Sequence, residues 1–306
     1  MNTNDHYVPQ FLLRRFNNSD KKIHVFDKWE SRDFATSTRN VASEKGFYDI
    51  QTDSGVESRE HDLTALENYA RPAITAVTDT NSLAETSDSD RARIAVYLSV
   101  QMLRTRAYRD MVRQMNDGLI ETMPTKSFGD SSELDEYFFR NDEQLKSESI
   151  SHLSMARELY PHLLSKAWIL NSPPPDESFL ISDNPLVKRN FHAPESMRSN
   201  GGLASPGIQI YFPLSPGLIL SLLCPTLVLP FQTLKAENPE LPNPISDAIS
   251  TGCTFAIPSE SVVYCNSLQI SNSTRFVFSC DGNFELAKEM VRSNPELRRP
   301  CHVAVE

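Results

Sequence analysis

His6 is the first residue of the sequence whose type and surroundings could support catalysis. It stands in the stretch DHYVPQFLLRRF, residues 5–16, next to Asp5 and shortly before a proline and two arginines. A histidine could act here as a general base, or bind a metal through its neutral ring. The alternative is structural, because His6 could equally cap a short helix or bond to a backbone carbonyl.

Two groups of carboxylates are further candidates. Glu60 and Glu67 are seven residues apart, which is almost two helical turns and places both on one face. Beside a buried stripe, each needs an arginine partner, unless it serves as a metal ligand or general base. Asp183 and Asn184 follow an expected strand and could hold a metal or a ribose, or could bond their own backbone in a turn. The predicted catalytic set is His6, Glu60, Glu67 and Asp183, with a divalent metal (Mg²⁺ or Mn²⁺) at Asp183 and Glu67.

One predicted helix is clearly basic in an otherwise acidic chain. It carries Arg91, Arg93, Arg104, Arg106, Arg109 and Arg113. Gln101 and Arg104 lie at the margin of its core stripe, where plain apolar residues would be expected. This helix could form one wall of an anion or phosphate cleft. Alternatively, Arg104 pairs with Glu67 across a helix interface and the other arginines are solvated. The predicted substrate-binding residues are Arg14, Gln101, Arg104 and Asn184, and Arg14 is expected to grip a phosphate or carboxylate.

The elements that must position these residues fall into two parts. Residues 1–165 are expected to be mainly helical, and residues 166–306 to carry the main antiparallel strands within the same single domain. We therefore predict an α+β fold, with a helical N-terminal half packed against a mostly antiparallel C-terminal sheet. In the first part the helices are predicted at about 9–16, 58–77, 91–115, near 136 and 142–165, with a strand at 22–28, another ending at Ile50 and a loop at 125–133.

Prolines mark two places where the expected elements should be interrupted. Pro72 lies inside the helix over 58–77 and predicts a kink or a split. The apolar run over 217–231 is predicted to be buried strand, because Pro225 and Pro230 interrupt it and it is short for a membrane span. In the second part, further strands are predicted at 167–172, 178–183, 208–214 and 275–279, and helices at 259–271 and 282–294.

Composition limits the possible classes of function. The formal net charge of −10 argues against broad wrapping of nucleic acid, which needs a positive surface, but it leaves room for a local basic cleft. Five cysteines without C-x-x-C spacing indicate a reduced chain rather than a disulfide framework or a zinc site. No signal pattern is present at the N-terminus. We therefore expect a cytoplasmic protein that does not bind membranes.

Motifs along nearly the whole chain, from His6 to Ser279, resemble one known family. They are HYVPQFLLRRF, NVASEKGFY, EHDLTALE, LSVQMLRTR, FLISDNPLV, FPLSPGLIL and, more loosely, YCNSLQISNSTRFVFS. Together they are similar to a bacterial family known as domain of unknown function 4238. The resemblance implies a one-domain intracellular protein of bacterial or phage-related origin. It implies no particular activity.

The opening stretch also resembles the D-H-x-x-P start of HNH nucleases. That resemblance implies that Asp5 binds a divalent metal and that His6 activates water, with Asn17 or Asn18 and then His24 completing the set. It also requires His6 on a hairpin strand and the last histidine on a helix. Here a helix is expected after Pro9, and His24 falls in a strand pattern, so the likeness is incomplete.

Two hypotheses follow for the function. The first, which the sequence favours narrowly, is a metal-dependent hydrolase or nuclease acting on a nucleotide or nucleic acid. The second is a non-catalytic binding or effector protein whose charged motif residues form a structural ion network. A direct pair between Glu67 and Arg104 would favour the second hypothesis.

Overall fold

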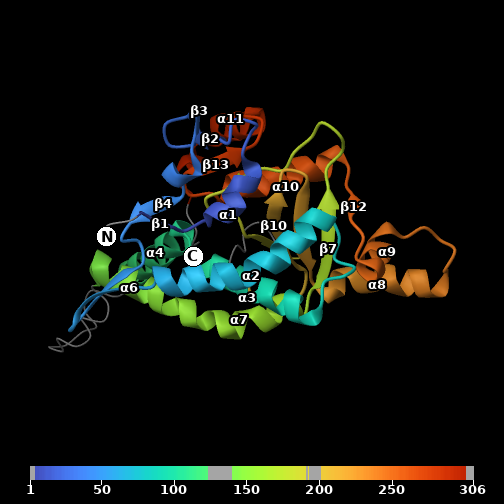
Figure 1. The fold of residues 1–306 in the computed structure, drawn as a ribbon, viewed down its shortest axis with the longest axis horizontal. Coiled ribbons are helices and arrows are strands. Elements are labelled where there is room, and N and C mark those ends of the chain that lie inside the picture. The colour runs from blue at the N-terminus through green and yellow to red at the C-terminus, as the bar shows by residue number, and fades with distance from the viewer. Residues whose placement is uncertain (1–3, 123–139, 191, 193–200, 301–306) are drawn as a thin grey trace.

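The structure is a computed structural model that describes residues 4–122, 140–190, 192 and 201–300. The loop predicted at 125–133 and the short helix predicted near Glu136 lie outside these residues. Within them the fold is α+β, as the sequence predicts, because the sheets are mainly antiparallel and a run of consecutive helices fills the middle of the chain. Figure 1 shows this arrangement.

The first sixty residues contain more strand than the sequence pattern indicates. Short antiparallel pairs form between β1 and β4, β2 and β3, and β5 and β6. The helix predicted after Pro9 is present but short. The elements of this segment are β1 (Asn4–His6), α1 (Gln10–Leu13), η1 (Arg14–Phe16), β2 (Ile23–Asp27), β3 (Arg32–Thr36), η2 (Thr38–Asn40), β4 (Ser43–Lys45), β5 (Asp49–Thr52) and β6 (Gly55–Ser58).

The middle of the chain is helical, as predicted. Its elements are α2 (Glu60–Thr80), α3 (Asp88–Leu103), α4 (Arg106–Thr122), α6 (Asp142–Ser151), η3 (His152–Met155) and α7 (Ala156–Leu164). α2 continues through Pro72, so the predicted split does not occur. Packing of its buried face, which includes Leu63, Ala70 and Ile74, against α3 holds the helix together there. α3 also packs along α7.

The prediction of a single basic helix over about 91–115 is wrong, because the structure has two helices there. α3 ends at Leu103 and α4 begins at Arg106. The break arises because the Thr105 hydroxyl accepts a hydrogen bond from the backbone N–H of Tyr108 at 3.2 Å, which starts a new helix. As a result, Arg104 and Arg106 belong to two different helix ends.

Two sheets organise the rest of the fold. The larger has the strand order β12-β7-β11-β10-β9, in which only the β12–β7 pair is parallel. The smaller has the order β3-β2-β13-β8 and therefore joins strands from both ends of the chain. The strands not yet given are β7 (Ala167–Ser172), β8 (Ile181–Ser182), β9 (Val187–Asn190), β10 (Ile208–Ser215), β11 (Leu218–Leu223), β12 (Phe255–Ala256) and β13 (Phe276–Ser279).

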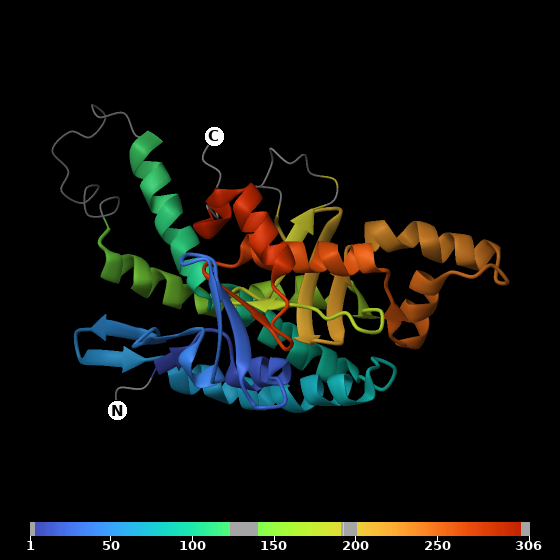
Figure 2. The ribbon, with the colours of Figure 1, turned by 90° about the horizontal axis from the view of Figure 1, so that it is seen from above.

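The apolar run predicted as strand over 217–231 is strand only in its first half. β11 ends at Leu223, and Pro225 then opens α8 at the first helical position, where a missing N–H costs little. α8 and α9 project away from the body of the protein in both views (Figures 1 and 2). The C-terminal helices are α8 (Pro225–Glu237), α9 (Pro244–Thr251), α10 (Ser259–Asn272), α11 (Glu285–Ser293) and η4 (Pro295–Arg298).

One large hydrophobic core connects the N-terminal segment, the central helices and the larger sheet. Leu12 and Phe16 of the opening stretch are fully buried in it, together with Leu98 of α3 and Phe212 of β10. The opening stretch is therefore anchored by its apolar residues. Among the described residues, no helix has the length and hydropathy needed to cross a membrane.

Candidate functional site

Arg104 is the centre of a buried polar cluster that joins three segments of the chain. Its side chain is 1% exposed, and its Nη1 donates to Glu67 Oε1 at 2.8 Å. Its Nε donates to the Tyr48 hydroxyl at 3.1 Å, and its Nη2 donates to the His6 carbonyl at 2.7 Å. Burial alone would lower the pKa of Arg104, but Tyr48 and Glu67 together raise it, so the charge is held firmly.

The partners of Arg104 are themselves tied into the fold. The Tyr48 hydroxyl donates to the Arg104 carbonyl at 3.0 Å, and the Tyr48 N–H donates to Asp5 at 3.2 Å. Burial raises the pKa of Tyr48 to about 12, so the phenol stays neutral. Gln101 is fully buried, and its Nε2 donates to the Tyr7 carbonyl at 2.9 Å. Gln101 and Arg104 therefore fasten β1 and its neighbours to α3, and neither is presented to solvent.

His6 and Glu60 keep buried polar atoms without a partner beside this cluster. Neither His6 Nε2 nor Glu60 Oε2 has a hydrogen-bond partner among the described residues. Burial lowers the pKa of His6, although the nearby Glu67 opposes this shift. Burial raises the pKa of Glu60 to about 7, against the opposing effect of Arg104. A neutral imidazole and a carboxyl that titrates near neutrality are able to take up or release a proton.

Asp183 is not part of this cluster. It is fully buried, and its two oxygens accept hydrogen bonds from the backbone N–H groups of Thr274, Arg275 and Phe276 at 2.7, 2.8 and 2.9 Å. Asn184 donates through Nδ2 to the Asn272 carbonyl at 3.0 Å. Asp183 and Asn184, which follow β8, therefore hold the chain to the residues just before and at the start of β13. This is a structural role.

The structure thus brings together some of the predicted site residues and separates others. His6, Glu60, Glu67 and Arg104 are near neighbours, because Glu67 and Arg104 both influence the pKa values of His6 and Glu60. Arg14 lies on the surface, where its Nη2 donates to Gln10 Oε1 at 2.7 Å.

The predicted metal site has no matching set of ligands in the part of the chain that the structure describes. No group of three or more His, Cys, Asp or Glu side chains there is placed to hold a metal ion. Asp183 has both oxygens occupied by backbone amides, and Glu67 pairs with Arg104. A divalent metal at these two residues therefore remains a prediction without structural support.

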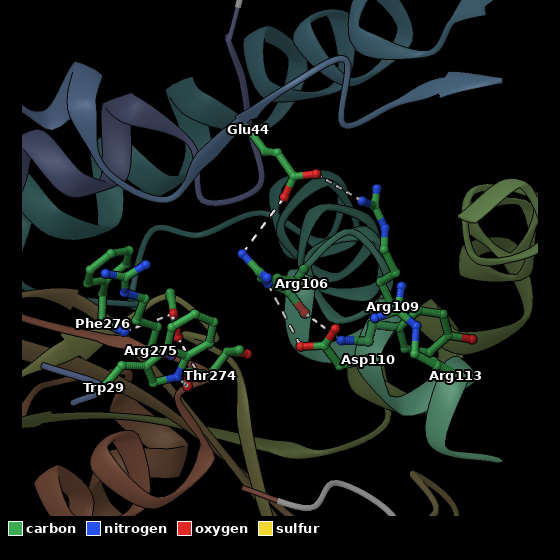
Figure 3. Close-up of polar contacts among 12 residues, drawn as sticks. Trp29, Glu44, Arg106, Arg109, Asp110, Arg113, Thr274, Arg275 and Phe276 are labelled. Atoms are coloured by element: carbon green, nitrogen blue, oxygen red, sulfur yellow. Dashed lines mark hydrogen bonds and ion pairs between the residues drawn. The ribbon is translucent and has the colours of Figure 1, made fainter. Parts of the chain in front are cut away.

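A second cluster of charged and aromatic side chains lies at the start of α4, and Figure 3 shows it. Glu44 of β4 reaches Arg106 at 3.9 Å and Arg109 at 3.5 Å. Asp110 lies 3.9 Å from Arg106. Arg109 also stacks on Phe47, with its guanidinium carbon 3.5 Å from the ring centre. The arginines of the predicted basic helix that take part in this cluster are therefore those of α4.

The side chains opposite α4 in this second cluster were not found by sequence reasoning. Trp29 follows β2, while Thr274 and Arg275 precede β13. Arg275 forks onto Asp27 through contacts of 2.7–3.1 Å and stacks on the Trp29 ring. No spacing rule could reveal this group, because pairing between β2 and β13 joins residues far apart in the sequence. The one available signal was Trp29 itself, a large aromatic residue at the end of a strand.

The two clusters and the fold define an α+β protein in which buried charges tie the N-terminal segment and the S-D-N-P stretch to the core. Residues 4–283 match the model of the family described as "Protein of unknown function (DUF4238)". The chain belongs to this family, as its motifs indicated. No curated protein and no solved structure matches the chain.

Proposed function

We propose that the protein binds a phosphate-bearing ligand and that its buried charged motif residues are structural. The observation that carries this proposal is the internal use of Arg104 and Asp183. All three nitrogens of the Arg104 guanidinium and both oxygens of the Asp183 carboxylate are bonded to the chain itself. Neither group could grip a substrate without giving up bonds that hold the fold together.

The arginines of α4 support phosphate as the ligand chemistry. Arg106, Arg109 and Arg113 recur at intervals of three and four residues, so they share one side of the helix. Arg109 Nε and Arg113 Nε are buried and have no hydrogen-bond partner among the described residues. Their terminal nitrogens already have partners, because Arg109 donates to the Phe47 carbonyl and Arg113 pairs with Asp142 at 3.0 Å. The remaining donors favour an acceptor such as a phosphate oxygen at this surface.

A thermal-shift panel tests the proposal. We expect inorganic phosphate or nucleoside monophosphates at millimolar concentration to raise the melting temperature, because a ligand that binds only the folded state stabilises it. Sodium chloride at matched ionic strength is the control for general salt effects. The absence of a shift with every phosphate compound, under conditions where chloride also has no effect, would contradict the proposal.

A second candidate function is the hydrolysis of a phosphate ester, with or without a divalent metal. The observation that favours it is Glu60, whose carboxyl pKa burial raises to about 7. Like His6, it keeps a buried polar atom without a partner among the described residues, and both groups feel the charges of Glu67 and Arg104. Here Glu60 and His6 would exchange protons with the substrate and water. Turnover of nucleotides or oligonucleotides that is lost in a folded Glu60→Gln variant would establish this candidate. The same result would make a purely binding role wrong.

A further inference from the structure

Trp29 lies where guanidinium groups from distant parts of the chain converge. The guanidinium carbon of Arg275 is 4.6 Å from the centre of the Trp29 ring. Those of Arg106 and Arg299 are 5.4 and 5.6 Å away. These arginines come from the start of α4, the residue before β13 and the end of η4. Attraction to the indole ring offsets part of the repulsion among three cations, but it does not neutralise them.

The three arginines differ in how far their charge is already paired. Arg275 is satisfied by its fork onto Asp27. Among the described residues, the carboxylates that pair with Arg106 are those of Glu44 and Asp110, and both lie 3.9 Å away, which is longer than a hydrogen bond. Arg299 is exposed, and its side chain forms no ion pair with any residue that the structure describes. Arg106 and Arg299, which both lie over the Trp29 ring, therefore have N–H donors available for a ligand.

The Thr274 hydroxyl and the N-terminal end of α4 also lie at this place, and each lacks a partner among the described residues: a hydrogen-bond partner for the hydroxyl and a negative charge for the helix end. Thr274 is 4% exposed, and its carbonyl accepts a hydrogen bond from Trp29 Nε1 at 3.1 Å. Its Oγ1 has no hydrogen-bond partner in the part of the chain that the structure describes. The first turn of α4 contains Arg106 and no acidic residue, although the positive end of a helix dipole favours an anion. Figure 3 shows Thr274 and Trp29 on the side of the cluster that faces Arg106. A bound anion would supply a partner for both features.

We propose that Trp29, Arg106, Arg275 and Arg299 form a binding site for the phosphate group of a small phosphorylated molecule. This proposal rests on the phosphate-binding function proposed above and assigns it to one place in the fold. Arg106 and Arg299 supply two cationic forks, which match the charge of a phosphomonoester dianion. The net charge of −10 disfavours a long nucleic acid at the same surface, because most of that chain would lie along acidic regions.

Tryptophan fluorescence can locate the ligand, because the chain contains only two tryptophans and one of them, Trp168, is buried elsewhere. We expect a titration with adenosine monophosphate to change the emission of the natural protein. A Trp29→Phe variant keeps an aromatic ring for the guanidinium groups. It should therefore still bind the nucleotide in calorimetry, while its fluorescence response is lost.

Arginine variants test the site itself. Arg106→Gln and Arg299→Gln should each weaken binding about tenfold, because each removes one charge-assisted contact to the phosphate. Arg157→Gln is the matched control and should bind normally, because Arg157 is an exposed residue of α7, outside the proposed site. Nucleotide binding that neither Arg106→Gln nor Arg299→Gln weakens would overturn this site while leaving the proposed function standing. No binding of any phosphate compound would overturn both, and tighter binding of an oligonucleotide than of the mononucleotide would overturn the small-molecule assignment.

Discussion

Arg104 and Arg106 are two residues apart and have opposite environments. Arg104 is 1% exposed and bonded through every guanidinium nitrogen, whereas the side chain of Arg106 is 37% exposed and its nearest carboxylates lie at 3.9 Å. The difference arises from the helix break at Thr105, which places the two side chains on different helix ends. A fully paired buried charge contributes to folding, while a loosely paired exposed charge remains available to a ligand.

Of the buried charged residues, Asp183 should cause the largest loss of stability when it is substituted. An Asp183→Ala variant removes the fully buried carboxylate that accepts from three backbone N–H groups, and it leaves them without that acceptor. We expect the free energy of unfolding to fall by about 3–5 kcal/mol, as measured by urea denaturation. Asp142→Ala is the matched control, because the side chain of Asp142 is 84% exposed and should matter little. Equal losses in the two variants would show that the contacts of Asp183 do not stabilise the fold.

Substitution of Arg104 should cause the second largest loss of stability. Arg104→Met removes the donors used by Glu67, Tyr48 and the His6 carbonyl, so we expect a loss of about 3 kcal/mol in the free energy of unfolding. Adding Glu67→Leu should recover part of that loss, because no unpaired carboxylate then remains in a mostly buried place. A double variant less stable than Arg104→Met would show that Glu67 stabilises the fold without its pair to Arg104.

The fold was predictable to the extent that it depends on local patterns. The helices beginning near Glu60 and Asp88, the β10–β11 hairpin and the β2 strand follow from hydrophobic spacing and turn residues. The break at Thr105 was not predictable, because the apolar stripe continues across it. α8 was missed for a related reason, since its many apolar residues resemble a strand until Pro225 is read as a helix start.

The candidate sites depended more strongly on tertiary structure. The pairing of Arg104 with Glu67 was one of two alternatives that the sequence offered, and helix packing decided between them. The roles of Asp183 could not be read from S-D-N-P alone, because its partners arrive from a segment some ninety residues later. Trp29 and Arg299 are near neighbours only because the strands from both ends of the chain share one sheet.

Glu60 should give the buried cluster a measurable pH dependence. Its pKa is raised to about 7 in the folded state, so the folded protein holds a proton that the unfolded chain releases above its ordinary pKa near 4.5. Stability should therefore fall as pH rises from about 4.5 to 7, and level off above. Because Glu60 is partly exposed, we expect a contribution of only about 1 kcal/mol. Glu60→Gln should remove this component from denaturation curves measured across the range, and an unchanged profile would contradict the assignment.

Arg106 provides the smallest stability effect and the sharpest contrast with Arg104. Because its two ion pairs are long and its side chain is partly exposed, Arg106→Gln should change the free energy of unfolding by less than about 0.5 kcal/mol. The same variant should lose about tenfold in affinity for a phosphate ligand, since hydrogen bonds to charged groups are the stronger kind. Denaturation and calorimetry on one preparation measure both effects. A large loss of stability would show that Arg106 is as structural as Arg104, and the contrast between two neighbouring arginines would disappear.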